Sequence, residues 1–158
     1  MDVERERDAR WNPQMVWVEP DPIARLAALR RDNLQQVVSQ VLSKGRAPRV
    51  CRYALSVGGQ WPSTSLGAAT AFAVRNAWQV GGEGQTFTDH RGASSPNLRT
   101  GWRLVRKLVR SGYADGVVVT TTSVISPHAD EYEQELNWFA LHCAFVAVVA
   151  PASQVGRL

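Results

Sequence analysis

Two short runs of apolar residues stand out in the pattern of hydrophobic and polar positions along this chain. Residues 117–119 read Val-Val-Val, and residues 145–149 read Phe-Val-Ala-Val-Val. Strands that are covered on both faces are continuous apolar runs of this kind, as in the parallel sheets of α/β proteins. Residues 50–57 have strand length and precede Gly58 and Gly59, so they are predicted to form the first strand of the same sheet.

Apolar residues recur at helical spacing in segments that alternate with these strands. The segments are residues 65–78, residues 101–110 with a cationic outer face, and a helix that begins at Ser126, Pro127 or His128. Strands that alternate with helices predict a three-layer α/β fold with a doubly wound, mostly parallel sheet. The residues expected to face the core in the last two helices are Trp102, Leu104, Val105, Leu108, Val109, Tyr132, Leu136, Phe139, Ala140 and Cys143.

A further amphipathic helix is predicted within residues 21–46, ahead of the first strand. Asp21 is a favoured N-cap, Pro22 is a favoured first helical residue, and Gly45 ends the segment. Such a helix must cover its apolar stripe against its own core or against another chain. The stripe consists of Leu34, Val37, Val38 and Val41.

The composition suits one globular domain. With 158 residues, of which 44% are hydrophobic and 20% charged, the chain is long enough to bury a single core. Residues 1–20 are rich in charge and contain prolines, so they are predicted to be a flexible segment. Residues 47–151 would form the α/β domain, and residues 152–158 a C-terminal tail.

The formal net charge is +4, and nearly all of the cations are arginines. This charge fits a phosphate-bearing partner, although a base-composition bias in the source genome would give the same excess. Cys51 and Cys143 stand in apolar surroundings and are expected to be buried thiols in a reducing cytoplasm. No residue spacing indicates a metal or cofactor site, and no apolar run approaches the ~20 residues that span a bilayer. We therefore expect a cytoplasmic protein with no metal, cofactor or membrane partner.

The second half of the chain has a distinctive order of motifs. A strand that ends in Asp89 precedes a Gly/Ser loop at residues 92–95, and Arg99-x-Gly101 then opens a helix. Residues 112–119 form a turn into a buried strand, with a helix and a last strand beyond. In this order and spacing, residues 50–151 resemble the catalytic domain of the serine recombinases (resolvases and invertases). The resemblance implies a resolvase-like fold in which a serine attacks a DNA phosphodiester while arginines hold the phosphate.

Most of the residues that the resemblance assigns to catalysis are replaced. The family opens with Tyr-x-Arg-x-Ser, whereas residues 53–57 read Tyr-Ala-Leu-Ser-Val, so Ser56 comes one residue early. Such a shift turns a strand side chain to the other face unless a bulge restores it. The family's Asp-Arg-x-x-Arg element reads Ser-Val-Ile-Ser-Pro at residues 123–127, which removes two more arginines. We therefore expect no catalytic residue, with Ser56 as the candidate nucleophile if the protein is active.

Several cations remain as candidates for binding phosphate or DNA. Arg52 shares a face of the first strand with Ser56, because side chains alternate along a strand. Arg99 matches the arginine of the family's Arg-x-Gly element and stands just ahead of a helix, where free N–H groups also bind anions. The other candidates lie on the outer face of the helix at residues 101–110: Arg103, Arg106, Lys107 and Arg110.

These observations lead to a leading hypothesis and to alternatives that stay open. The leading hypothesis is a degenerate serine-recombinase-like domain that is not an enzyme and acts as a binding or assembly module, with weak, non-specific DNA binding. Because the resemblance leaves the helix at residues 21–46 without a place in the family core, we expect its stripe to build a homo-oligomer, a dimer in the simplest case, or to bind a protein partner. The first alternative is an active DNA-nicking or site-specific recombinase subunit that uses Ser56. The second is a flavodoxin-like module for a small ligand or nucleotide near Ser56, Asp89 and Ser123.

Overall fold

Strand β1 (Arg49–Ser56) is the centre of the sheet and has neighbours on both sides. The computed structural model of this protein describes residues 21–82, 85–92 and 94–150. On one side, β1 pairs in parallel with β4 (Gly116–Val119), and β4 pairs in parallel with β5 (Phe145–Val148). On the other side, β1 pairs with β2 (Gln79–Val80) near its beginning and with β3 (Thr86–His90) toward its end. All of these pairings are parallel, so the predicted sheet type is confirmed.

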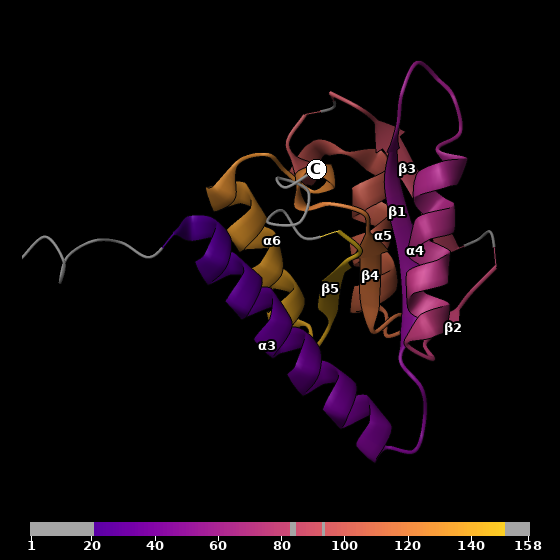
Figure 1. Cartoon of the computed structure of the whole chain (residues 1–158), viewed down its shortest axis with the longest axis vertical. Coiled ribbons are helices and arrows are strands. Elements are labelled where there is room, and N and C mark those ends of the chain that lie inside the picture. Colours follow the sequence, from indigo (N-terminus) through magenta and orange to yellow (C-terminus); the bar gives the residue numbers. More distant parts are fainter. Residues whose placement is uncertain (1–20, 83–84, 93, 151–158) are drawn as a thin grey trace, which may run out of the picture.

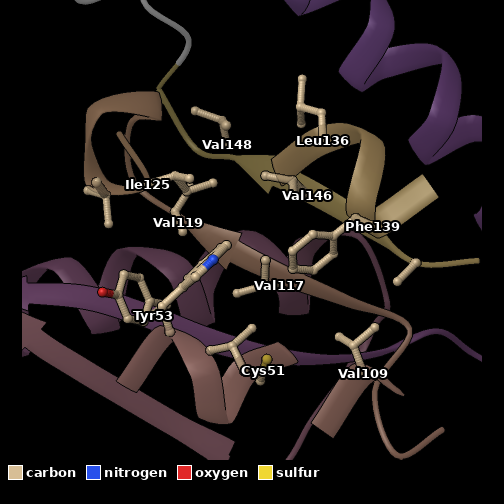
Figure 2. Packing of buried hydrophobic residues seen from close by; sticks show 14 of the residues in the cluster. Cys51, Tyr53, Val109, Val117, Val119, Ile125, Leu136, Phe139, Val146 and Val148 are labelled. Atoms are coloured by element: carbon tan, nitrogen blue, oxygen red, sulfur yellow. The ribbon is translucent and has the colours of Figure 1, made fainter. Parts of the chain in front are cut away.

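Helices cover the sheet on both faces, as Figure 1 shows. Helices α5 (Thr100–Arg110) and α6 (Ala129–Leu141) lie on one face, and each follows a short 3-10 turn, η2 (Pro96–Leu98) or η3 (Thr122–Val124). Helix α4 (Ser63–Arg75) lies on the other face. Figure 2 shows the core between the sheet and the helices α5 and α6, where Cys51, Val117 and Val146 pack toward Phe139 and Leu136. The three-layer α/β fold expected from the sequence is thereby confirmed.

Helix α3 (Pro22–Ser43) closes the β5 edge of the sheet. It begins as predicted, because the Asp21 carboxylate accepts a 3.1 Å hydrogen bond from the N–H of Ile23. Its first half contributes Leu26 to the core on the α6 side, and its second half contributes Val37 to the core on the α4 side. The helix runs past β5 between these two halves, as seen in Figure 1. It is therefore an integral part of the three-layer unit.

The apolar stripe of α3 faces the chain's own core. Val37 and Val41 are each 4% exposed, and Leu34 and Val38 pack against the same cluster. The surface that we expected to build a homo-oligomer or bind a partner is thus covered within the chain. In this position α3 also covers the edge of the sheet that β5 would otherwise leave open. Whether the protein forms a dimer stays a prediction, and a dimer would need another surface.

A few of the residues expected in the core are exposed. Cys51 is buried, but Cys143 is exposed because the chain leaves α6 there with a φ of 56° and turns toward β5. Ala140 and Leu104 also face solvent, the latter with 44% of its surface exposed. The buried arc of each helix is therefore narrower than the predicted stripe. The segments predicted at residues 1–20 and 152–158 lie outside the described residues.

None of the helices in the described ranges has the length and apolar character that a membrane span requires.

Candidate functional site

Asp89, near the carboxyl end of β3, joins three elements of the fold. Its carboxylate accepts a 2.6 Å hydrogen bond from the hydroxyl of Tyr53 on β1. It also accepts hydrogen bonds from the backbone N–H groups of Gly101 and Trp102 in the first turn of α5, at 2.8 and 2.9 Å. Free N–H groups and the helix dipole make such a helix start a favourable place for an anion. Here the chain's own carboxylate occupies that place.

Gly101 permits this close approach of α5 to β3. A Cβ atom at this position would lie 2.8 Å from Oδ2 of Asp89 and closer still to the carbonyl oxygen of Thr88. Glycine is the residue that allows a backbone to approach so closely. Burial, followed by the hydrogen bond to Asp89, raises the pKa of Tyr53, so its hydroxyl keeps the proton that it donates. The Arg-x-Gly motif thus has a structural explanation in this chain.

Arg99 is buried just ahead of α5 and holds two loops together. Only 6% of its surface is exposed. Its Nε donates to the carbonyl oxygen of Ser94, and its Nη1 donates to that of Val124, both at 2.8 Å. A guanidinium has five N–H donors, and two of those of Arg99 bond to the backbone of the loops that flank it. These two bonds give Arg99 a structural role, and its predicted contact with phosphate stays a prediction.

Ser56 leaves β1 on the opposite face from Tyr53. The pairing of β1 with β3 is regular from Arg52↔Thr86 to Ser56↔His90, so no bulge shifts the side chains. Tyr53 packs on the α5 side, in an edge-on contact with Trp102. Alternation along the strand therefore directs Ser56 toward the α4 side, where its hydroxyl donates a 3.3 Å hydrogen bond to the backbone carbonyl of Asp89. The candidate nucleophile and the buried Arg99 do not converge.

Arg52 shares the α4 side with Ser56, as the sequence predicts, and its terminal nitrogens are engaged there, whereas its buried Nε has no hydrogen-bond partner among the described residues. Its Nη1 donates to the hydroxyl of Thr70 on α4 at 3.0 Å. Its Nη2 donates to the carbonyl oxygens of Gly81 and Gly82 at 2.9 Å. Burial lowers the pKa of this guanidinium. These bonds tie β1 to α4 and to the β2–β3 connection.

The cations of α5 separate into two groups. Arg106 is only partly exposed, because its Nη2 pairs with Glu135 at 3.3 Å and its guanidinium lies over the ring of Trp138. Arg106 is therefore not on the fully exposed outer face that the sequence predicts for it. Arg103, Lys107 and Arg110 are exposed and line a shallow depression of about 240 Å³ together with Leu104. These three residues are the predicted DNA-binding cations that remain accessible.

Glu135 is a buried acid that the sequence analysis missed. It is 3% exposed and accepts a 2.7 Å hydrogen bond from the indole N–H of Trp102. Burial raises its pKa, while the bond from Trp102 and the charge of Arg106 oppose the rise. Its position gives the signal that would have found it: Glu135 follows Tyr132 by three residues and thus lies on the buried side of α6.

Asp115 forms a second polar cluster at the amino end of the sheet, away from Ser56. Its carboxylate binds Arg46 at 2.7 Å and also accepts hydrogen bonds from the backbone N–H and the Nε of Arg49. Burial alone would raise the pKa of Asp115, but these bonds outweigh it and lower the pKa to about 2. The cluster holds the start of β4 against the start of β1.

Ser123, expected with Ser56 and Asp89 at a small-ligand site, instead lines a separate cavity beside α3. Within the described residues there is no group of three or more His, Cys, Asp or Glu side chains placed to hold a metal ion.

The fold is similar to that of two catalytic domains of known crystal structure. The C-terminal catalytic domain of ISC1926 TnpA, an IS607-like serine recombinase, aligns with a TM-score of 0.55 and 19% identity, over 69% of this chain and 75% of that chain. The N-terminal catalytic domain of TP901-1 integrase aligns with a TM-score of 0.54 and 17% identity, over 64% of this chain and 76% of that chain. No protein-family model and no curated protein matches the sequence. The resemblance to the serine recombinases is thus confirmed at the level of the fold.

Proposed function

We propose that this protein is a catalytically inactive domain with the serine-recombinase fold, which acts as a binding or assembly module and contacts DNA weakly. One observation carries the proposal: Ser56 and Arg99 lie on opposite sides of β1. Phosphoryl transfer by a serine needs the hydroxyl and the cations that stabilise the developing charge around one phosphate. Their separation across β1 supports an inactive domain.

The other polar groups that could bind a phosphate are also occupied by partners within the chain. The N–H groups at the start of α5 hold Asp89, and Arg52 holds Thr70 and the backbone of the β2–β3 connection. A phosphate would have to displace these internal partners before it could bind. Because one preorganised electrostatic stabiliser is typically worth about 10²-fold in rate, the loss of several such groups supports an inactive domain.

The exposed cations of α5 support a role in weak DNA contact. Arg103, Lys107 and Arg110 are accessible and have no ion-pair partner among the described residues. Contacts to phosphates carry no direct information about base sequence. We therefore expect binding that tolerates any sequence and weakens steeply as salt is added, since each neutralised phosphate releases counterions.

The activity part of the proposal is tested by incubating the intact chain with supercoiled plasmid and separating the DNA forms on a gel. The matched control is Ser56→Ala, which removes only the candidate hydroxyl. We expect the wild type and the variant to leave the plasmid equally supercoiled. Relaxation or nicking by the wild type that Ser56→Ala abolishes would establish the enzyme alternative instead.

A further inference from the structure

A cavity of about 430 Å³ lies between the first turns of α3, the η3 turn and the start of α6. Its wall on α3 is apolar and includes Ile23, Ala24 and Ala27. Small-molecule sites typically have volumes of roughly 300–1,000 Å³, a mostly apolar lining and a few polar groups that fix the ligand. This cavity has such a volume, a mostly apolar lining and a few polar groups. Its lining includes neither Ser56 nor Asp89, and none of the α5 cations.

Arg30 is the cation in the lining of this cavity. It is half-buried, and its Nη1 donates a 2.9 Å hydrogen bond to the hydroxyl of Tyr132, a neutral partner. Among the described residues, Arg30 forms no ion pair, whereas Arg25 on the same helix binds Glu133 with both terminal nitrogens. A partly desolvated guanidinium without a carboxylate favours an anion from elsewhere.

The other polar groups around the cavity include two carboxylates, and neither of them forms an ion pair with Arg30. Ser123 and Thr122 offer hydroxyl groups that can donate to an acid. Asp21 is the carboxylate in the lining, but it is exposed and caps α3 through the N–H of Ile23. Glu131, in the first turn of α6, accepts a 2.6 Å hydrogen bond from the hydroxyl of Ser126.

We propose that this cavity binds a small organic anion with an apolar body, such as an aromatic or branched aliphatic acid. The acid group pairs with Arg30, and the apolar body lies against Ala24 and Ala27. This inference is independent of the proposed function, because none of its residues takes part in the Ser56 or α5 surfaces.

Two fluorescent probes of similar shape test the proposal on the intact chain. The probe 8-anilinonaphthalene-1-sulfonate is apolar and anionic, and N-phenyl-1-naphthylamine is its neutral counterpart. We expect the anionic probe to bind more tightly and Arg30→Gln to weaken it about tenfold, since a hydrogen bond to a charged group is lost. The same variant should leave the affinity for the neutral probe unchanged, because the apolar wall of the cavity stays intact. Arg31→Gln, an exposed neighbour on α3, is the matched charge control and should leave both affinities unchanged.

A second variant checks that the probes report on this cavity. Ala27→Phe places a ring in the cavity and should abolish the binding of both probes, while circular dichroism confirms that α3 remains helical. The proposal is overturned if the intact chain binds neither probe, if the affinity for the anionic probe is the same in Arg30→Gln and the wild type, or if the binding survives Ala27→Phe.

Discussion

The hydroxyl of Tyr53 and the carboxylate of Asp89 form a 2.6 Å hydrogen bond that joins β1 to β3, and the same carboxylate caps α5. One acid thus fixes the position of a strand and a helix at the carboxyl edge of the sheet. An external anion cannot use the N–H groups at the start of α5 while Asp89 holds them. The start of α5, which would otherwise favour an external anion, thus has a structural role in this chain.

Tyr53→Phe should therefore destabilise the fold. The change removes a hydrogen bond to an ionised group and leaves the apolar contacts of the ring with Trp102 in place. We expect the free energy of unfolding to fall by about 1.5–3 kcal/mol, measured by urea denaturation. Tyr113→Phe, at a tyrosine that is 64% exposed, is the control and should change stability by less than about 0.5 kcal/mol. Equal stabilities of the two variants would show that the Tyr53 bond contributes nothing.

The cluster around Asp115 should make stability depend on acid pH. The pKa of Asp115 is about 2 in the folded chain and near 4 in an unfolded one, so the folded state favours the ionised form. This contribution is present above about pH 4 and is lost as the pH falls toward 2, which amounts to about 2 kcal/mol. Unfolding free energies measured between pH 5 and pH 2 should fall less in Asp115→Asn than in the wild type. Parallel curves for the two proteins would refute the assignment.

Replacing the exposed cations of α5 should weaken DNA binding uniformly across sequences. The triple variant changes Arg103, Lys107 and Arg110 to Gln, and its control changes Arg31, Lys44 and Arg75 to Gln, so both lose the same charge. For each phosphate contact that disappears, the slope of log affinity against log salt should become shallower by about 0.9. Fluorescence anisotropy with unrelated duplexes measures this slope. An equal effect of the control, or nanomolar binding to one sequence only, would contradict a DNA-contacting α5 surface.

Truncating a side chain in the apolar stripe of α3 should lower the stability of the fold and leave the oligomeric state unchanged. Val37 is 4% exposed in the chain's own core, so Val37→Ala leaves a void there and should lower the unfolding free energy by about 1–3 kcal/mol. Leu42→Ala, on the same helix but 57% exposed, should be nearly neutral. Light scattering should give the same molar mass for the wild type and for both variants. A variant that stays stable but loses a dimer would return the stripe to its expected role as an interface.

The main elements of the fold could be predicted because their signals are local. The apolar runs at residues 117–119 and 145–149 became β4 and β5, and Asp21 with Pro22 marked the start of α3. The alternation along the first strand also predicted that Ser56 would point to the face opposite to that of the family's serine, which comes one residue later. These features depend on a few neighbouring residues and on the alternation of side chains along a strand.

The side-chain partners could not be predicted, because they join residues far apart in the sequence. The stripe of α3 looked free, since nothing local reveals that a helix at the front of the chain covers the last strand. Arg106 seemed exposed because its partner Glu135 comes from another helix. The anion site ahead of α5 seemed open because Asp89, which fills it, lies on β3.

We predict that Ser56 forms no covalent bond to DNA. Mass spectrometry of the intact protein tests it most directly, after incubation with supercoiled plasmid and digestion of the DNA by nuclease. We expect the protein mass to be unchanged in the wild type, as in Ser56→Ala. A protein fraction that carries the mass of attached nucleotides in the wild type, and is missing in Ser56→Ala, would contradict it.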